Sequence, residues 1–152
     1  MKKILIVEDD EFKLENLSEC ISSRVSGVSV VFARSIVSSL RQLESAQDID
    51  LVILDMSLPT YDVGPDESGG RPQGFGGLTV MQHLDALERD IPVLVVTQFL
   101  SFEQDDEIVE VADLQQSLST DFARLFIGLI QYSGGSDNWK DELVAKLEGV
   151  FS

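Results

Sequence analysis

The chain has 152 residues, of which 43% are hydrophobic, and a formal net charge of −16 at pH 7. This length is typical of one domain with a buried core, so we expect a single domain over residues 1–152. Phosphate backbones and anionic lipids repel so acidic a surface, which argues against nucleic acid or a membrane as a partner. The single cysteine cannot form an intrachain disulfide, and the apolar run near the N-terminus is too short for an export signal. We therefore expect a cytoplasmic protein.

Short aliphatic runs alternate with segments of helical periodicity. Five strands are expected, in residues 3–7, 28–32, 51–54, 91–97 and 125–132. Five helices are expected, one from Glu11, one from Ser35, one around Val80, one over residues 103–118, and one from Ser136 or Asp137. This alternation predicts an α/β fold with a parallel sheet covered by helices on both faces.

Inward-facing positions are expected where apolar residues recur at helical spacing; in the last helix they are Trp139, Leu143, Leu147 and Val150. Residues 60–77 break the pattern, because they hold six of the eleven glycines and two of the four prolines. Such a segment is expected to be an inserted surface loop. Cys20 and His83 are expected to be an apolar contact and a half-buried or exposed side chain, without a role in a site.

Acidic residues follow two of the expected strands. Glu8 and Asp9 end the first, Asp55 ends the third, and Thr97 ends the fourth. If these strands are neighbours, the carboxylates meet at one edge of the sheet and repel one another by ~1 to 4 kcal/mol per pair at 4 Å. A hard divalent cation relieves that repulsion, and all-oxygen ligation suits Mg²⁺. Asp55 would then be a nucleophile toward phosphorus.

The segments "ILIVEDD", "LVILDMSLP" and "VLVVTQ" resemble the first, third and fourth strands of bacterial response-regulator receiver domains. This CheY-like family is flavodoxin-like. The resemblance implies a three-layer α/β/α sandwich with a five-stranded parallel sheet in the order 2-1-3-4-5. That order supplies the adjacency that the acidic residues require.

By the same resemblance, Asp55 is the phosphoacceptor of a two-component phosphorelay, while Glu8 and Asp9 hold Mg²⁺ together with the Ser57 carbonyl. Thr97 would bond a phosphoryl oxygen through its hydroxyl and act as the switch. The implied partners are a histidine kinase or histidine phosphotransfer protein and a downstream protein target; a homodimer is compatible with the sequence.

The end of the fifth strand departs from the family pattern. Receivers usually carry a lysine there, whereas this chain has Gln131, Tyr132 and Ser133. In receivers the ammonium of this lysine pairs with the phosphoryl group. Its absence should slow phosphotransfer or weaken the coupling of phosphorylation to the switch. Arg71 is an alternative cation, and Lys140 is expected to point elsewhere.

Three functions are weighed on this basis. The first is a stand-alone receiver that accepts phosphate on Asp55 and signals by protein contact. The second is a pseudo-receiver, a binding module with little or no phosphotransfer because the lysine is missing. An aspartate-nucleophile phosphohydrolase is disfavoured, since such enzymes place a second acid two residues after the nucleophile, where this chain has Ser57. We therefore expect a phosphoacceptor and not an enzyme.

Overall fold

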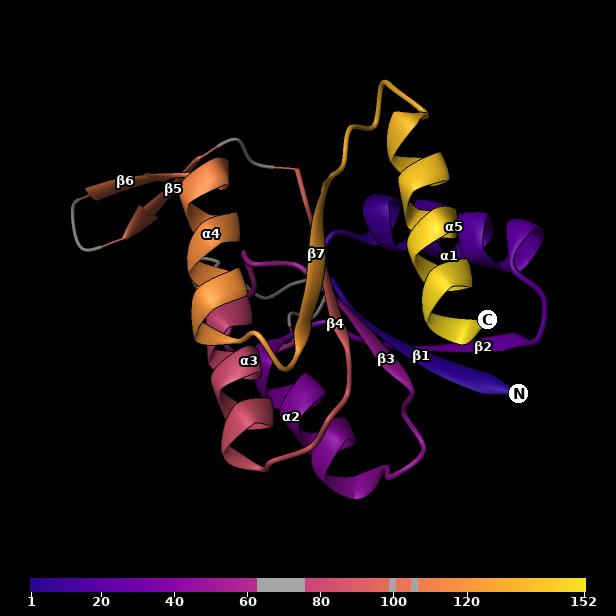
Figure 1. Cartoon of the computed structure of the whole chain (residues 1–152), viewed down its shortest axis with the longest axis horizontal. Helices are drawn as coiled ribbons and strands as arrows, with labels where there is room; N and C mark the ends of the chain where they lie inside the picture. The colour runs from indigo at the N-terminus through magenta and orange to yellow at the C-terminus, as the bar shows by residue number, and fades with distance from the viewer. Residues whose placement is uncertain (63–75, 99–100, 105–106) are drawn as a thin grey trace.

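The computed structural model describes residues 1–62, 76–98, 101–104 and 107–152. Strands and helices alternate along most of this length, as Figure 1 shows. In chain order the elements are β1 (Lys2–Val7), α1 (Glu11–Arg24), β2 (Val28–Ala33), α2 (Ile36–Ser45), β3 (Leu51–Leu54), α3 (Gly76–Ala86), β4 (Val93–Thr97), β5 (Ser101–Gln104), β6 (Glu107–Glu110), α4 (Val111–Asp121), β7 (Phe126–Gln131) and α5 (Asn138–Phe151).

Five of the strands form one parallel sheet in the order β2-β1-β3-β4-β7. Because β7 is the fifth strand of this sheet along the chain, the observed order confirms the predicted order 2-1-3-4-5. The strands β1, β3 and β4 lie side by side at its centre. Their carboxyl ends therefore meet at one edge, as parallel strands require.

Helices cover both faces of the sheet, which confirms the three-layer arrangement (Figure 1). On one face, α1 and α5 pack against alternate strand residues such as Ile4 and Ile6. On the other face, α2, α3 and α4 pack against the intervening residues such as Leu5 and Val7. Successive side chains along each strand therefore pack into two separate hydrophobic layers, one on each face of the sheet.

The predicted helix over residues 103–118 is wrong in its first half. Strands β5 and β6 pair antiparallel there, and α4 begins only at Val111. Ile108 fits the helical spacing of Val111, Leu114 and Leu118 but lies in β6. Figure 1 places this hairpin to one side of the sheet, beside α4.

One inward-facing prediction at a helix end is also wrong. Val150 is 36% exposed, whereas Trp139, Leu143 and Leu147 are buried as predicted. Val150 lies in the last turn of α5, one residue before the helix ends. Of the predicted loop 60–77, residues 63–75 lie outside the described part, and α3 already begins at Gly76.

Polar side chains cap the starts of α1 and α2. Asp10 is the N-cap of α1, where its Oδ1 accepts the Lys13 N–H at 3.1 Å. Ser35 caps α2 in a reciprocal arrangement with Ser38. Within the described ranges, no helix is both long enough and apolar enough to cross a bilayer.

Candidate functional site

The predicted acidic residues lie at the carboxyl edge of the sheet. Glu8 and Asp9 directly follow β1, and Asp55 follows β3, its N–H donating to the Val7 carbonyl at 3.1 Å. Glu8 and Asp55 are buried, whereas Asp9 is half-buried. Thr97 ends the neighbouring strand β4 and is also buried. The strands β1, β3 and β4 are therefore neighbours, as the predicted clustering of these residues requires.

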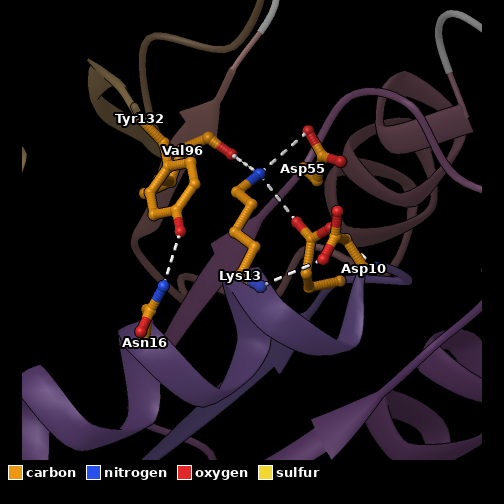
Figure 2. Close-up of polar contacts among 7 residues, drawn as sticks. Asp10, Lys13, Asn16, Asp55, Val96 and Tyr132 are labelled. Carbon is orange, nitrogen blue, oxygen red and sulfur yellow. Dashed lines mark hydrogen bonds and ion pairs between the residues drawn. The ribbon is translucent and has the colours of Figure 1, made fainter. Parts of the chain in front are cut away.

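A lysine from helix α1 reaches into this cluster. Lys13 is 1% exposed, and its Nζ lies 2.7 Å from Glu8 Oε2 and 3.4 Å from Asp55 Oδ1. The same ammonium donates to the Val96 carbonyl on β4 at 2.8 Å. Figure 2 shows the Lys13 side chain extending from α1 toward Asp55 and Val96. One buried cation thus joins the ends of three neighbouring strands.

An aromatic residue lies on the other side of that ammonium. The Tyr132 ring centroid is 5.6 Å from Lys13 Nζ, within the range of a cation–π contact. Asn16, one turn after Lys13 on α1, donates its side-chain amide to the Tyr132 hydroxyl at 2.9 Å (Figure 2). Tyr132 directly follows β7, among the three residues that stand where the resemblance would place a lysine, and its ring contacts the lysine that comes from α1.

Burial raises the pKa values of Glu8 and Asp55. Desolvation, reinforced by the nearby Asp55 charge, raises the pKa of Glu8 to about 7, although Lys13 opposes the shift. Desolvation also raises the pKa of Asp55, again against the attraction of Lys13. A single ammonium cannot fully compensate two buried carboxylates. The cluster therefore retains an affinity for a second cation or a proton.

The remaining predicted residues border the cluster. Burial raises the pKa of Asp9, while Arg34 on the β2 side lowers it, and the Arg34 guanidinium donates to the Asp9 carbonyl at 3.4 Å. Ser57 is half-buried, two residues after Asp55. Asp10, which follows Asp9, is exposed and serves as the N-cap of α1.

The donor set suits a hard cation but is partly engaged. Glu8 Oε1 accepts the Asp10 N–H at 3.0 Å and Oε2 pairs with Lys13, so both of its oxygens have partners. Across the described ranges, no three acidic, histidine or cysteine side chains are grouped closely enough to enclose a metal. Mg²⁺ usually keeps several waters and needs only one or two protein carboxylates. Asp9 and Asp55 would therefore provide enough carboxylates to bind it.

Helix α3 is packed closely against the phosphoacceptor candidate. Gly77 donates its N–H to the Met56 carbonyl at 2.9 Å, and an added Cβ there would collide with the Asp55 carbonyl oxygen. Only glycine allows this approach. The first turn of α3 therefore fixes the backbone that carries Asp55.

Lys13, Tyr132 and Asn16 were not identified from the sequence as members of the site. A signal for Lys13 was available, because it shares a helix face with Leu17 and Cys20, both buried. Of the two cations considered instead, Arg71 lies outside the described residues. Lys140 pairs with Asp137 at 3.1 Å, away from the cluster as expected.

The comparisons with known proteins agree with this fold. A family model described as the response regulator receiver domain matches residues 4–119, and the chain belongs to this family. The matched range contains Glu8, Asp9, Lys13, Asp55 and Thr97. Residues 120–152, which include β7 and Tyr132, lie beyond it.

Curated relatives of similar length carry a related description. The Detocs response regulatory protein DtcB of Enterobacter cloacae is 25% identical over 146 residues, covering 95% of this chain and 97% of its own. The protein of the same name from Vibrio alginolyticus is 29% identical over 148 residues, covering 95% and 99%. The chain is therefore similar to response regulatory proteins along nearly its whole length.

Solved receiver structures share the fold at low sequence identity. The response regulator TrrA from Thermotoga maritima, solved in complex with Mg²⁺ and BeF, superimposes with a TM-score of 0.67 at 23% identity, covering 99% of each chain. A CheY-like receiver domain from Methanospirillum hungatei gives 0.65 at 19% identity, covering 99% of this chain and 94% of its own. These similarities confirm the flavodoxin-like, CheY-like architecture.

Proposed function

We propose that this receiver accepts a phosphoryl group on Asp55 in the presence of Mg²⁺ and passes the signal to a protein target by surface contact. The donor would be a histidine kinase or a histidine phosphotransfer protein in the cytoplasm. The observation that carries the proposal is the order of the parallel sheet: β1, β3 and β4 are neighbours, and their carboxyl ends carry the Glu8–Asp9 pair, Asp55 and Thr97.

The transfer itself is a simple displacement at phosphorus. A carboxylate oxygen of Asp55 attacks the phosphorus atom of the donor and forms a new O–P bond. The bond from phosphorus to the donor's leaving atom breaks, and the leaving group departs with the electron pair; with acetyl phosphate it departs as acetate. The proposal treats the chain as a phosphoacceptor and not as a turnover enzyme.

Mg²⁺ would be held by Asp9, Asp55 and the Ser57 carbonyl, with Glu8 contributing its charge from beside Lys13. When bound, the metal supplies neutralisation of the charge that the phosphoryl group adds. Glu8 and Lys13 then keep the buried end of Asp55 in place. The Thr97 hydroxyl would report the phosphoryl group to the surface formed by α4, β7 and α5.

Labelling tests the proposal directly. Radiolabelled acetyl phosphate with Mg²⁺ should label the wild type, and Asp55→Asn should abolish the label because it lacks the nucleophilic oxygen. Asp48→Asn is the matched control, since Asp48 is an exposed carboxylate that pairs with Lys3, outside the acidic cluster. A wild type that stays unlabelled, or an Asp55→Asn variant that keeps its label, contradicts the proposal.

A pseudo-receiver is the second candidate, and one observation favours it. Lys13 forms an ion pair with Glu8 and lies close to Asp55. Its positive charge therefore partly neutralises the carboxylates without metal or phosphate. Such a protein would bind its partner without Asp55 chemistry. Absence of both labelling and a response to Mg²⁺ with beryllofluoride would favour this function.

A further inference from the structure

Lys13 is among the largest fully buried side chains of the protein, and its charge is the reason to ask what it does. Burying an ammonium is costly unless each of its three donors finds an acceptor. Here the acceptors are Glu8 Oε2, the Val96 carbonyl and the more distant Asp55 Oδ1. The first two contacts are short, at 2.7 and 2.8 Å, whereas the third is 3.4 Å.

The longest of the three contacts, at 3.4 Å, is the one to Asp55, the proposed phosphoacceptor. Asp55 Oδ1 is buried, and among the described residues it has no hydrogen bond of good geometry. One donor of Lys13 is therefore held near Asp55 without being fully used. An oxygen attached to Asp55 through phosphorus would offer this donor a more negative acceptor.

The protein also fixes where the ammonium stands. The Asp10 cap holds the backbone of Lys13, and the Tyr132 ring, itself bonded to Asn16, bounds the ammonium on the β7 side. In the described part of the chain, no other basic side chain is ion-paired with Asp55. Among the described basic side chains, Lys13 is therefore the one already paired with the carboxyl that would carry the phosphoryl group.

We propose that Lys13 is the residue that binds the phosphoryl group on Asp55, so that helix α1 supplies the cation absent from the end of β7. This inference rests on the proposed function. The ammonium keeps its proton throughout and donates a hydrogen bond from Nζ to a phosphoryl oxygen. It keeps its contacts with Glu8 and the Val96 carbonyl on β4, so the new contact adds a link from α1 to the phosphoryl group at the end of β3.

The test compares Lys13→Met with the wild type in two separate titrations. Beryllofluoride binding in excess Mg²⁺, followed by fluorine NMR, reports the contact to a phosphoryl-like group. Mg²⁺ binding alone, followed by Trp139 fluorescence, reports whether the acidic site is intact. Lys2→Met is the matched control, because Lys2 is exposed and lies at the opposite end of β1.

We expect Lys13→Met to weaken beryllofluoride binding about tenfold or more, the usual effect of losing a charge-assisted hydrogen bond. Its Mg²⁺ affinity should be equal to that of the wild type or tighter, because a competing cation has been removed. A loss of beryllofluoride affinity below about fivefold overturns the inference. A parallel loss of Mg²⁺ affinity also overturns it, since that result indicates a structural role.

Lys13→Met leaves two buried carboxylates uncompensated and is at risk of not folding. In that event Glu8→Gln is compared with Glu8→Gln/Lys13→Met, in which both members of the short ion pair are neutral, and the same thresholds apply. If the wild type itself does not bind beryllofluoride, the proposed function fails together with this inference. If the wild type binds and the lysine variants bind equally well, only this inference fails.

Discussion

At the scale of single residues, Lys13 determines the charge balance of the acidic cluster. Its ammonium lies between Glu8 and Asp55, two carboxyls whose burial raises their pKa values. One positive charge against two potential negative charges leaves the cluster deficient in cations when both carboxyls are ionised. Mg²⁺ and protons therefore compete for the same residual charge.

That competition predicts a pH-dependent Mg²⁺ affinity. With a pKa of about 7, Glu8 is mostly protonated at about pH 6 and mostly ionised at about pH 8. Only the ionised form attracts the metal, so affinity should rise by roughly tenfold between these values. A Mg²⁺ titration followed by Trp139 fluorescence at each pH measures this affinity. Glu8→Gln should show a shallower dependence, and an unchanged wild-type affinity over this interval would refute the prediction.

The same residues show where sequence reasoning was sufficient and where it was not. Glu8, Asp9, Asp55 and Thr97 were identified because each ends a recognisable aliphatic strand, and the structure places them at one edge. Lys13 was missed because a lysine in the first turn of a helix resembles a solvated residue. Two of its partners, Asp55 and Val96, lie far away in the sequence, so the only local signal was its place on the helix face that carries Leu17 and Cys20.

At the scale of elements, helix α3 controls the backbone that carries Asp55. Its first turn approaches so closely that Gly77 has no room for a side chain, with the Asp55 carbonyl oxygen in the way and Met56 Cε 2.7 Å from the position of an added Cβ. The N–H of Gly77 also bonds the Met56 carbonyl at 2.9 Å. A shift of α3 would therefore displace Asp55 as well.

Two alanine substitutions separate this effect from general helix propensity. Gly77→Ala should lower the free energy of unfolding by ~1 to 3 kcal/mol, because the added methyl overpacks a fixed backbone. Gly149→Ala, in α5 where no atom lies within 4 Å of the added Cβ, should raise it by ~0.5 to 1 kcal/mol. Urea denaturation followed by Trp139 fluorescence measures both. Equal effects at the two positions would contradict the close approach.

The elements that could not be predicted are those without a distinctive local pattern. The five parallel strands follow from continuous aliphatic runs, and their helices from apolar residues at helical spacing. The sequence predicts a helix where β5 and β6 form, because Ile108, Val111, Leu114 and Leu118 recur at helical intervals. Two four-residue strands are too short for their alternation to be distinguished from one helical turn.

At the scale of the whole molecule, the sheet brings acidic residues together in a chain that already carries a net charge of −16. Self-repulsion of such a charge destabilises the compact state, and dissolved salt screens it. The strand order adds a local excess of negative charge at the carboxyl edge, to which β1 and β3 bring Glu8, Asp9 and Asp55. General screening and specific Mg²⁺ binding should therefore stabilise the fold separately.

Thermal unfolding at matched ionic strength distinguishes the two contributions. NaCl should raise Tm for the wild type and for Asp55→Asn alike, because it acts on the total charge. MgCl₂ should raise the wild-type Tm further, since a ligand at about 100 times its Kd adds ~2.7 kcal/mol to the free energy of unfolding. For a chain of this size that corresponds to roughly 5 to 10 °C. Asp55→Asn should lose most of the additional increase, because the carboxylate that would share the metal with Asp9 has become an amide. If MgCl₂ and NaCl give the same Tm for the wild type, the acidic edge binds no specific Mg²⁺, and protonation of Glu8 or Asp55 then removes the charge that Lys13 leaves uncompensated.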